Sequence, residues 1–242
     1  MPTPTRTFGG VKLPPAHHHR DIQGGTLRPA LFGAMDGLVS NGSLIAGVAG
    51  SGATTHTVAL TALAGLVAGA FSMAVGEYTS VRAQEEAVLN EVALERLELR
   101  RAPASEQAEL AAAYVARGLQ PELAQQVAAQ LSQDPEVELR VHTQEELGVD
   151  IDNLPSPWTA SGSSFVAFAA GAVVPSVPYF LGLHLLWLAL LLGALGLFGA
   201  GAAVSRFTGR SYWLSGGRQL LLGAVAAAVT FGVGHLVGAG IS

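Results

Sequence analysis

Cysteine is absent from this chain of 242 residues, so disulfide bonds and thiolate metal sites are excluded. Charge is scarce as well, since 13% of the residues are Asp, Glu, Lys or Arg, about half the share of typical soluble domains. Half of the residues are hydrophobic, which excludes an intrinsically disordered chain and argues against an ordinary soluble enzyme. The net charge of −5 argues against nucleic acid as a partner, because nucleic-acid-binding proteins carry a basic face.

The few charges are distributed unevenly. Asp36 is the single charged residue in 29–50 and Glu77 the single one in 52–81, while 158–205 and 219–242 contain none. A helix of about 20 apolar residues crosses a bilayer, and lipid requires backbone polar groups to be paired within the helix. Buried helices of a soluble protein are the alternative, but four such runs are hard to bury together. We therefore predict an all-α integral membrane protein with five transmembrane helices, near 29–50, 55–78, 160–180, 184–205 and 219–240.

The basic residues predict the orientation. With five spans, all 13 Lys and Arg fall on the side that holds the N-terminus, 79–157 and 206–218. The positive-inside rule assigns that side to the cytoplasm and the C-terminus to the opposite side. The predicted organisation is a cytoplasmic tail at 1–28, spans one and two at 29–78, a cytoplasmic domain at 79–157 and spans three to five at 158–242. The tail lacks the apolar core of a signal peptide. His17, His18 and His19 are either metal ligands or part of an unstructured tail, and we favour the tail.

The predicted cytoplasmic domain holds most of the 18 acidic residues and is helical. No helix breaker lies between Glu77 and Arg100, so span two is expected to continue to about Arg101. Pro103 then interrupts the chain, and Ser105 is a suitable N-cap for the next helix. The helices expected after this break are 106–117, 121–133 and 135–147.

Carboxylates repeat at helical spacing in this domain. Glu91, Glu95 and Glu98 share one helical face, and Glu106 and Glu109 share a face of the next helix. Like charges at this spacing repel by a few tenths of a kcal/mol, so arginine or a metal ion should offset them. Glutamates from several helices bind iron and manganese in helical bundles, and oxygen donors suit Mn, Fe(II), Mg or Ca. A solvated acidic face is the alternative.

Two acidic side chains lie within the predicted spans. Asp36 is about 10 Å into span one at 1.5 Å per residue, and Met73 lies at a similar depth in span two. Glu77, one turn further out, either faces the same path or extends to the interface. An ionisable residue in a membrane helix is functional by default, and a carboxylate beside a thioether could pass Fe(II) and exchange protons. Ser40 and Asn41 either line this path or form interhelical hydrogen bonds.

Small residues recur at a spacing that permits close helix contact. Gly65 and Gly69 form a GxxxG motif in span two, and Gly234 and Gly238 form another in span five. Such motifs hint at a homo-oligomer, although glycine is frequent throughout this chain.

Four stretches carry a resemblance to a known family: residues 36–48 (DGLVSNGSLIAGV), 69–81 (GAFSMAVGEYTSV), 114–119 (YVARGL), and 161–165 (SGSSF) followed by Pro175 and Pro178. Through them the sequence resembles a bacterial-type member of the vacuolar iron transporter family, which includes the yeast calcium-sensitive cross-complementer and plant vacuolar iron importers. The resemblance covers nearly the whole chain after residue 20. It implies a five-span homodimer with the path at the dimer interface. It also implies export of Fe(II), often with Mn(II), from the cytosol in exchange for protons.

The resemblance also implies roles for individual residues. The aspartate and methionine that line the family's path match Asp36 and Met73. Some members place methionines before the last glutamate of the cytoplasmic site, where this chain has His142, which is either a borderline ligand or a surface residue. The metal-binding glutamates of the family's cytoplasmic domain match Glu95, Glu98, Glu106, Glu109 and Glu146.

These observations lead to one principal hypothesis and two alternatives. The principal hypothesis is a proton-coupled exporter of Fe(II) and Mn(II), without a prosthetic group, in a bacterial inner membrane as the Ala- and Gly-rich composition suggests. Its partners are a second copy of the chain, protons, lipid and divalent ions, with other divalent ions admitted at the cytoplasmic site. One alternative is a membrane-anchored di-iron oxidase, although Glu95 and Glu106 lack the histidine three residues on that such sites use. The other is a metal sensor or buffer without transport.

Overall fold

The computed structural model describes residues 7–8, 11–12 and 26–241, so the prediction for His17–His19 and most of the tail at 1–28 lies outside the described residues. Within the described part the fold is all-α, apart from the short paired strands β1 (Thr7–Phe8) and β2 (Val11–Lys12). The helical elements are α1 (Leu27–Gly50), α2 (Thr55–Arg101), α3 (Pro103–Ala116), α4 (Pro121–Leu131), α5 (Pro135–His142), a π-helical turn (Thr143–Leu147), α6 (Pro157–Phe180), α7 (Leu186–Thr208) and α8 (Tyr212–Ile241).

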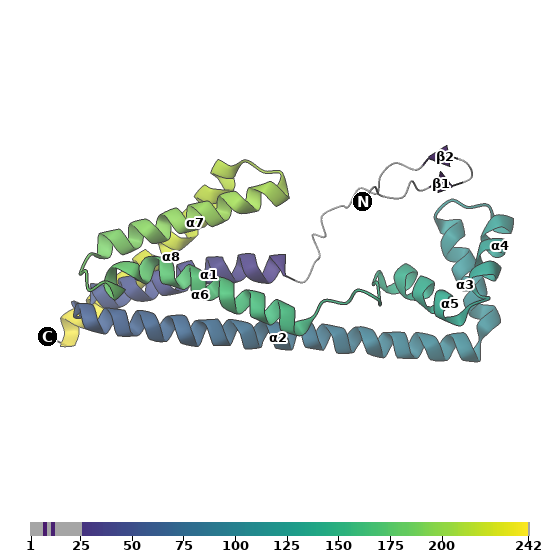
Figure 1. Ribbon diagram of the computed structural model, residues 1–242, viewed down its shortest axis with the longest axis horizontal. Helices are drawn as coiled ribbons and strands as arrows, with labels where there is room; N and C mark the ends of the chain where they lie inside the picture. The colour runs from purple at the N-terminus through teal and green to yellow at the C-terminus, as the bar shows by residue number, and fades with distance from the viewer. Residues whose placement is uncertain (1–6, 9–10, 13–25, 242) are drawn as a thin grey trace.

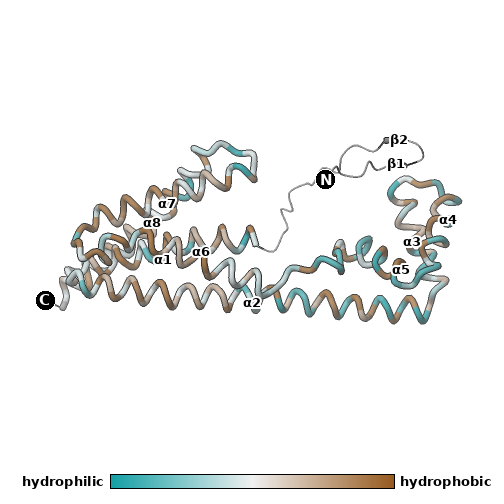
Figure 2. The backbone as a smooth tube through the Cα atoms, viewed as in Figure 1, coloured by the Kyte–Doolittle hydropathy of each residue, from teal (hydrophilic) through white to brown (hydrophobic). Residues whose placement is uncertain are grey.

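Among the described residues, five helices are long and apolar enough to cross a membrane, namely α1, α2, α6, α7 and α8. This confirms the predicted all-α integral membrane fold. Hydrophobic residues dominate α1, α6, α7, α8 and the first half of α2 (Figure 2). Hydrophilic residues dominate the second half of α2 and α5. The α1–α2 turn, the α6–α7 turn and the C-terminus lie at one end of the bundle, and the α7–α8 turn lies at the other (Figure 1). Five antiparallel spans require this arrangement.

Close backbone contacts hold α1 at the centre of the bundle. A Cβ atom placed on Gly33 would lie 2.6 Å from the backbone oxygen of Ser164 in α6. One placed on Gly238 of α8 would lie 2.5 Å from the backbone oxygen of Ser51. Glycine is therefore required where these helices meet, because any side chain would separate them.

The two GxxxG motifs are used inside the chain. Gly65 and Gly69 of α2 face Asn41 and the ring of Phe168, and Gly234 packs against Gly47. Contacts inside the chain therefore account for both motifs, and the homo-oligomer stays a prediction.

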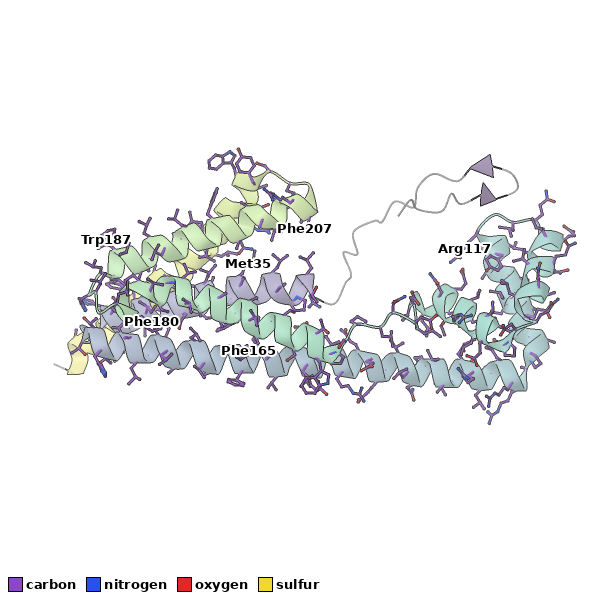
Figure 3. All side chains as sticks on the ribbon, viewed as in Figure 1. Met35, Arg117, Phe165, Phe180, Trp187 and Phe207 are labelled. Atoms are coloured by element: carbon purple, nitrogen blue, oxygen red, sulfur yellow. The ribbon has the colours of Figure 1, made fainter. Side chains whose placement is uncertain are left out.

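Helix α2 links the membrane bundle to a polar domain, which we define as residues 79–156. It runs for 47 residues, and Thr54 caps its start by accepting a hydrogen bond from Thr57 N at 3.2 Å. Figure 1 shows it as one long rod that carries α3, α4 and α5 at its far end. Arg117 lies in this distant part, well away from Phe165 of the membrane bundle (Figure 3). The metal sites predicted for the two regions therefore share one continuous helix.

The polar domain differs from the sequence prediction in two places. Helix α3 begins at Pro103, since proline is well suited to the first helical position, so Ser105 lies inside the first turn and is no N-cap. Helix α5 begins as expected after Asp134, which accepts a hydrogen bond from Glu136 N at 2.9 Å. After His142 it changes to a π-helical turn that ends at Gly148 in the left-handed conformation.

Candidate metal centre and membrane cavity

A cavity of about 350 Å³ opens between α1 and α2 in the membrane bundle. All five residues predicted for a path through the membrane line it: Asp36, Ser40 and Asn41 from α1, and Met73 and Glu77 from α2. Gly65, Gly69, Ser72, Gly76, Leu44 and Phe168 complete the lining. Sequence analysis missed Ser72 and the glycines as lining residues, although they lie on the same face of α2 as Met73. The glycines leave the space that makes this a cavity.

Asp36 has a local hydrogen bond but no cationic partner. Ser40 Oγ donates to Asp36 Oδ1 at 2.7 Å, one turn further along α1. In the part of the chain that the structure describes, no Lys, Arg or His nitrogen lies within 4.0 Å of the Asp36 or Glu77 carboxylate. Two carboxylates and one thioether thus share a cavity without a compensating basic side chain. An ionisable group in that position is costly unless it serves a cation or a proton.

Asn41 combines the two roles that the sequence left open. Its Nδ2 donates across to α6, to the backbone oxygen of Ala172 at 3.0 Å and to Ser176 Oγ at 2.8 Å. Its Oδ1 is buried without a hydrogen-bond partner and faces Gly65 in the cavity lining. The residue is therefore both an interhelical hydrogen-bond donor and a lining residue.

A second centre lies in the polar domain, where α2, α5 and the π-helical turn meet. Glu95, His142 and Glu146 each offer a ligand atom, and these atoms lie within 4.8 Å of one another. His142 Nδ1 is 3.1 Å from Glu95 Oε1 and 3.3 Å from Glu146 Oε1. His142 is only 1% exposed, so it is no surface residue. A ring nitrogen has one hydrogen at most and cannot donate fully to both carboxylates, whereas a cation at this point would be shared by all three groups.

The remaining predicted glutamates surround this trio. Burial raises the pKa of Glu106 on α3, and the charges of Glu109, Glu98 and Glu146 raise it further while His142 opposes them. Glu106 is buried, and Glu98 and Glu109 are exposed. All six predicted ligands are thus electrostatic neighbours, but Glu98, Glu106 and Glu109 lie outside the trio of closely spaced atoms.

Glu95 is the most perturbed carboxyl group of this centre. Burial raises its pKa to about 7, and the nearby charges of Glu146, Glu106 and Glu98 act in the same direction, while His142 opposes them. In the metal-free protein Glu95 is therefore partly protonated at neutral pH. A cation would favour its ionised form, because nearby opposite charge lowers a carboxyl pKa.

Four of the six arginines of the polar domain pair with or approach other acids. Arg82 binds Glu85 and Glu86, Arg96 binds Glu136 through both nitrogens, Arg117 binds Glu145, and Arg140 approaches Asp152. Over the described residues, no Arg or Lys nitrogen lies within 4.0 Å of the carboxylates of Glu95, Glu98, Glu106, Glu109 or Glu146. Arginine therefore does not supply the compensating charge that the repeated glutamates call for.

One buried acid near this centre was missed from the sequence. Glu138 is 7% exposed, and its Oε1 has no hydrogen-bond partner. It lies one helical turn before His142, so the i, i+4 spacing of the two could have identified it.

Carboxylate oxygens with one imidazole, the donor set of the Glu95, His142 and Glu146 trio, suit Fe(II) and Mn(II).

Comparison with known proteins shows which family the chain belongs to. A model of the VIT family matches residues 27–235, which include the membrane cavity and the whole polar domain. The chain belongs to the VIT family. The relatives of this VIT-family chain include a protein named vacuolar iron transporter from Acanthamoeba castellanii, 36% identical over 88% of this chain and 78% of the relative.

Plant relatives match over a similar length. The vacuolar iron transporter 1 of Arabidopsis thaliana is 29% identical over 91% of this chain and 90% of its own length. The vacuolar iron transporter homolog 1 of Oryza sativa subsp. japonica is 33% identical over 88% of this chain and 74% of its own length. The named relatives of this VIT-family chain are thus transporters rather than enzymes, and the resemblance seen in the sequence is confirmed at the level of the family.

Proposed function

We propose that this protein moves Fe(II), and with it Mn(II), out of the cytosol in exchange for protons. The observation that carries the proposal is the cavity between α1 and α2, in which Asp36, Met73 and Glu77 face one space within the membrane bundle. Membership of a family whose named members are iron transporters supports the choice of metal.

The cluster of Glu95, His142 and Glu146 is the proposed capture site. Its ligands must be deprotonated to hold a metal ion, and the arginines nearby are bound to other acids. Glu98, Glu106 and Glu109 extend the negative field around the trio and would guide cations towards it. Other divalent ions that accept oxygen and imidazole ligands would bind here too.

Asp36 is the proposed site of exchange between metal and proton. A carboxylate that binds a metal ion gives up its proton, and a proton that arrives displaces the metal. Ser40 Oγ donates a hydrogen bond to Asp36 Oδ1 at 2.7 Å, which holds this carboxylate in position. The Met73 thioether adds a softer ligand, which favours Fe(II) over harder ions such as Mg(II).

The basic residues support the proposed orientation. Arg28 is in the first turn of α1, and Arg206, Arg210 and Arg218 are at or near the α7–α8 turn. The start of α1 and the α7–α8 turn lie at the end of the bundle nearer the polar domain (Figure 1), so that end faces the cytoplasm by the positive-inside rule. We place the protein in a bacterial inner membrane on its Ala- and Gly-rich composition, although its named relatives are vacuolar. The family resemblance supports a homodimer, with the cavity side of α1 and α2 towards the partner.

Flux into proteoliposomes with an imposed proton gradient tests the proposal. Wild type is compared with Asp36→Ala, with Glu95→Ala/Glu98→Ala and with Glu122→Ala, a control at an exposed acid of α4. We expect gradient-dependent Fe(II) and Mn(II) flux that Asp36→Ala abolishes, that the double substitution reduces, and that Glu122→Ala leaves unchanged. If wild type binds metal in the polar domain but carries no flux, the protein is a sensor or a metal-binding protein instead.

A further inference from the structure

Asn41 lines the inner part of the membrane cavity, together with Leu44 and Gly65. It lies five residues beyond Asp36 on α1, about 7.5 Å deeper at 1.5 Å per residue, and close to the middle of the helix that spans Leu27–Gly50. The side chain is 1% exposed. Its position is therefore the deepest at which the described cavity offers a polar group from α1.

Hydrogen bonds to α6 fix the orientation of the Asn41 amide. Ser176 Oγ donates its only hydrogen to the backbone oxygen of Ala172 at 2.6 Å, so it can only accept from Asn41. The Ala172 oxygen, 3.0 Å from Asn41 Nδ2, is an acceptor as well. Both partners on α6 are acceptors, so they must face the NH₂ group of Asn41. In the reversed amide orientation, Oδ1 would face two acceptors and could bond to neither. Oδ1 must therefore point away from α6, towards α2.

That oxygen has nothing to bind in the described structure. Asn41 Oδ1 is buried and lacks a hydrogen-bond partner, and a Cβ on Gly65 would lie 2.7 Å from it. A buried polar atom without a partner costs about 1–3 kcal/mol, and lipid supplies no replacement donor. Gly65, which has no side chain, faces it from α2. A metal ion that moves inward from Asp36 therefore breaks no hydrogen bond when it reaches this oxygen.

We propose that Asn41 Oδ1 is a metal ligand in the middle of the membrane, which receives the ion from Asp36 and Met73. Ser176 and the Ala172 carbonyl are the positioning groups that keep the oxygen turned towards the path. A neutral oxygen suits this step, because a ligand in a conducting path must bind strongly enough to accept the ion and weakly enough to release it. This inference rests on the transport function proposed above.

Four variants of the full-length protein in proteoliposomes test it, with Fe(II) under anoxic conditions as the probe. Asn41→Leu removes the oxygen, and Asn41→Asp keeps one facing the cavity while its protonated form can donate to α6. Gly65→Ala places a methyl group 2.7 Å from Oδ1 and 2.5 Å from Leu44 Cδ2, and it removes no hydrogen-bonding group of Asn41. Gly199→Ala is the matched control, because nothing lies within 4 Å of a Cβ at that position on α7.

We expect Asn41→Leu and Gly65→Ala to lower Fe(II) flux about ten-fold or more, while Asn41→Asp keeps most of it and Gly199→Ala is unchanged. Fe(II) binding by the polar domain should be the same in all four. If Asn41 served only to join α1 and α6, Gly65→Ala would transport normally although Asn41→Leu did not, and that result would overturn the inference. If Asp36→Ala blocks flux but Asn41→Leu and Gly65→Ala both carry wild-type flux, the role of Asn41 is overturned and the transport function stands. An absence of flux in wild type overturns both.

Discussion

His142 lies at the position where the family resemblance implies methionine in some members. Its imidazole is buried, and its Nδ1 lies within 3.3 Å of two carboxylates. An imidazole is a borderline ligand, whereas a thioether favours softer metals. The residue at position 142 is therefore expected to set the metal preference of the capture site.

Replacing His142 by methionine should change that preference. We expect His142→Met to lower Mn(II) affinity about ten-fold, and to lower the affinity for a softer ion such as Cd(II) less, because the thioether retains soft ligands better than hard ones. Isothermal titration of both metals measures the ratio. His56→Met, which substitutes a histidine near the start of α2, is the matched control. Equal losses for both metals would contradict a selectivity role.

The pKa of Glu95 predicts the pH range in which metal binding at the capture site weakens. Its pKa in the metal-free protein is about 7, raised chiefly by burial, and a bound metal requires the ionised form. Above pH 7 the Glu95 carboxylate is mostly ionised and can bind a metal ion directly. Below pH 7 the metal ion must displace the proton of Glu95. We therefore expect Mn(II) affinity to fall about ten-fold per pH unit between pH 7 and 5 for that one proton.

Titration of Mn(II) binding across pH 5–8 checks this, with Glu95→Gln as the comparison. The variant should bind weakly and show a smaller dependence between pH 6 and 7. A flat profile for wild type over the whole range would show that Glu95 is not a ligand.

At the scale of the element, α2 connects the two centres. Met73 and Glu77 lie in its membrane half and Glu95 in its polar half, with no break between them. Ala87→Pro should kink the helix between the centres, because proline removes a backbone hydrogen bond and clashes with the preceding turn. We expect Fe(II) flux to fall several-fold while metal affinity of the polar domain stays the same.

The control for this substitution is Ala87→Gly, which softens the helix by about 1 kcal/mol without forcing a kink. Flux through both proteins is compared in the same proteoliposome assay, and binding is measured by titration. Normal flux through Ala87→Pro would mean that metal reaches the membrane cavity without a fixed geometry between the centres.

The elements show how far sequence reasoning extends. The five spans and the long α2 could be predicted because charge-free runs and uninterrupted helix formers are local signals. Ser105 misled, because its capping ability competed with Pro103, whose preference for the first helical turn prevailed. The π-helical turn after His142 was not predicted, because the sequence up to Leu147 shows no break from an ordinary α-helix. The unpaired Oδ1 of Asn41 was equally hidden, since it follows from hydrogen bonds to residues 131 and 135 positions away.

At the scale of the whole molecule, the absence of cysteine makes the orientation directly testable. Leu181 is in the α6–α7 turn and Ser211 is in the α7–α8 turn, at opposite ends of the bundle, and both positions are exposed. Each is replaced by a single cysteine. In intact cells a membrane-impermeant maleimide should label Leu181→Cys and spare Ser211→Cys, which should react after the cells are lysed. The reverse pattern would contradict the proposed cytoplasmic position of the polar domain.

Under the proposed function, the length of α2 also determines which metal concentration the capture site responds to. Glu95 lies 18 residues beyond Glu77, about 27 Å along the helix axis, and Figure 1 shows α2 running straight between the two halves. Anionic lipids enrich divalent cations at a membrane surface, but this enrichment decays over a Debye length of about 8 Å at physiological ionic strength. A capture site held several such lengths away responds to free metal in the bulk cytosol. Changes in lipid headgroup charge should therefore leave its set point unaltered.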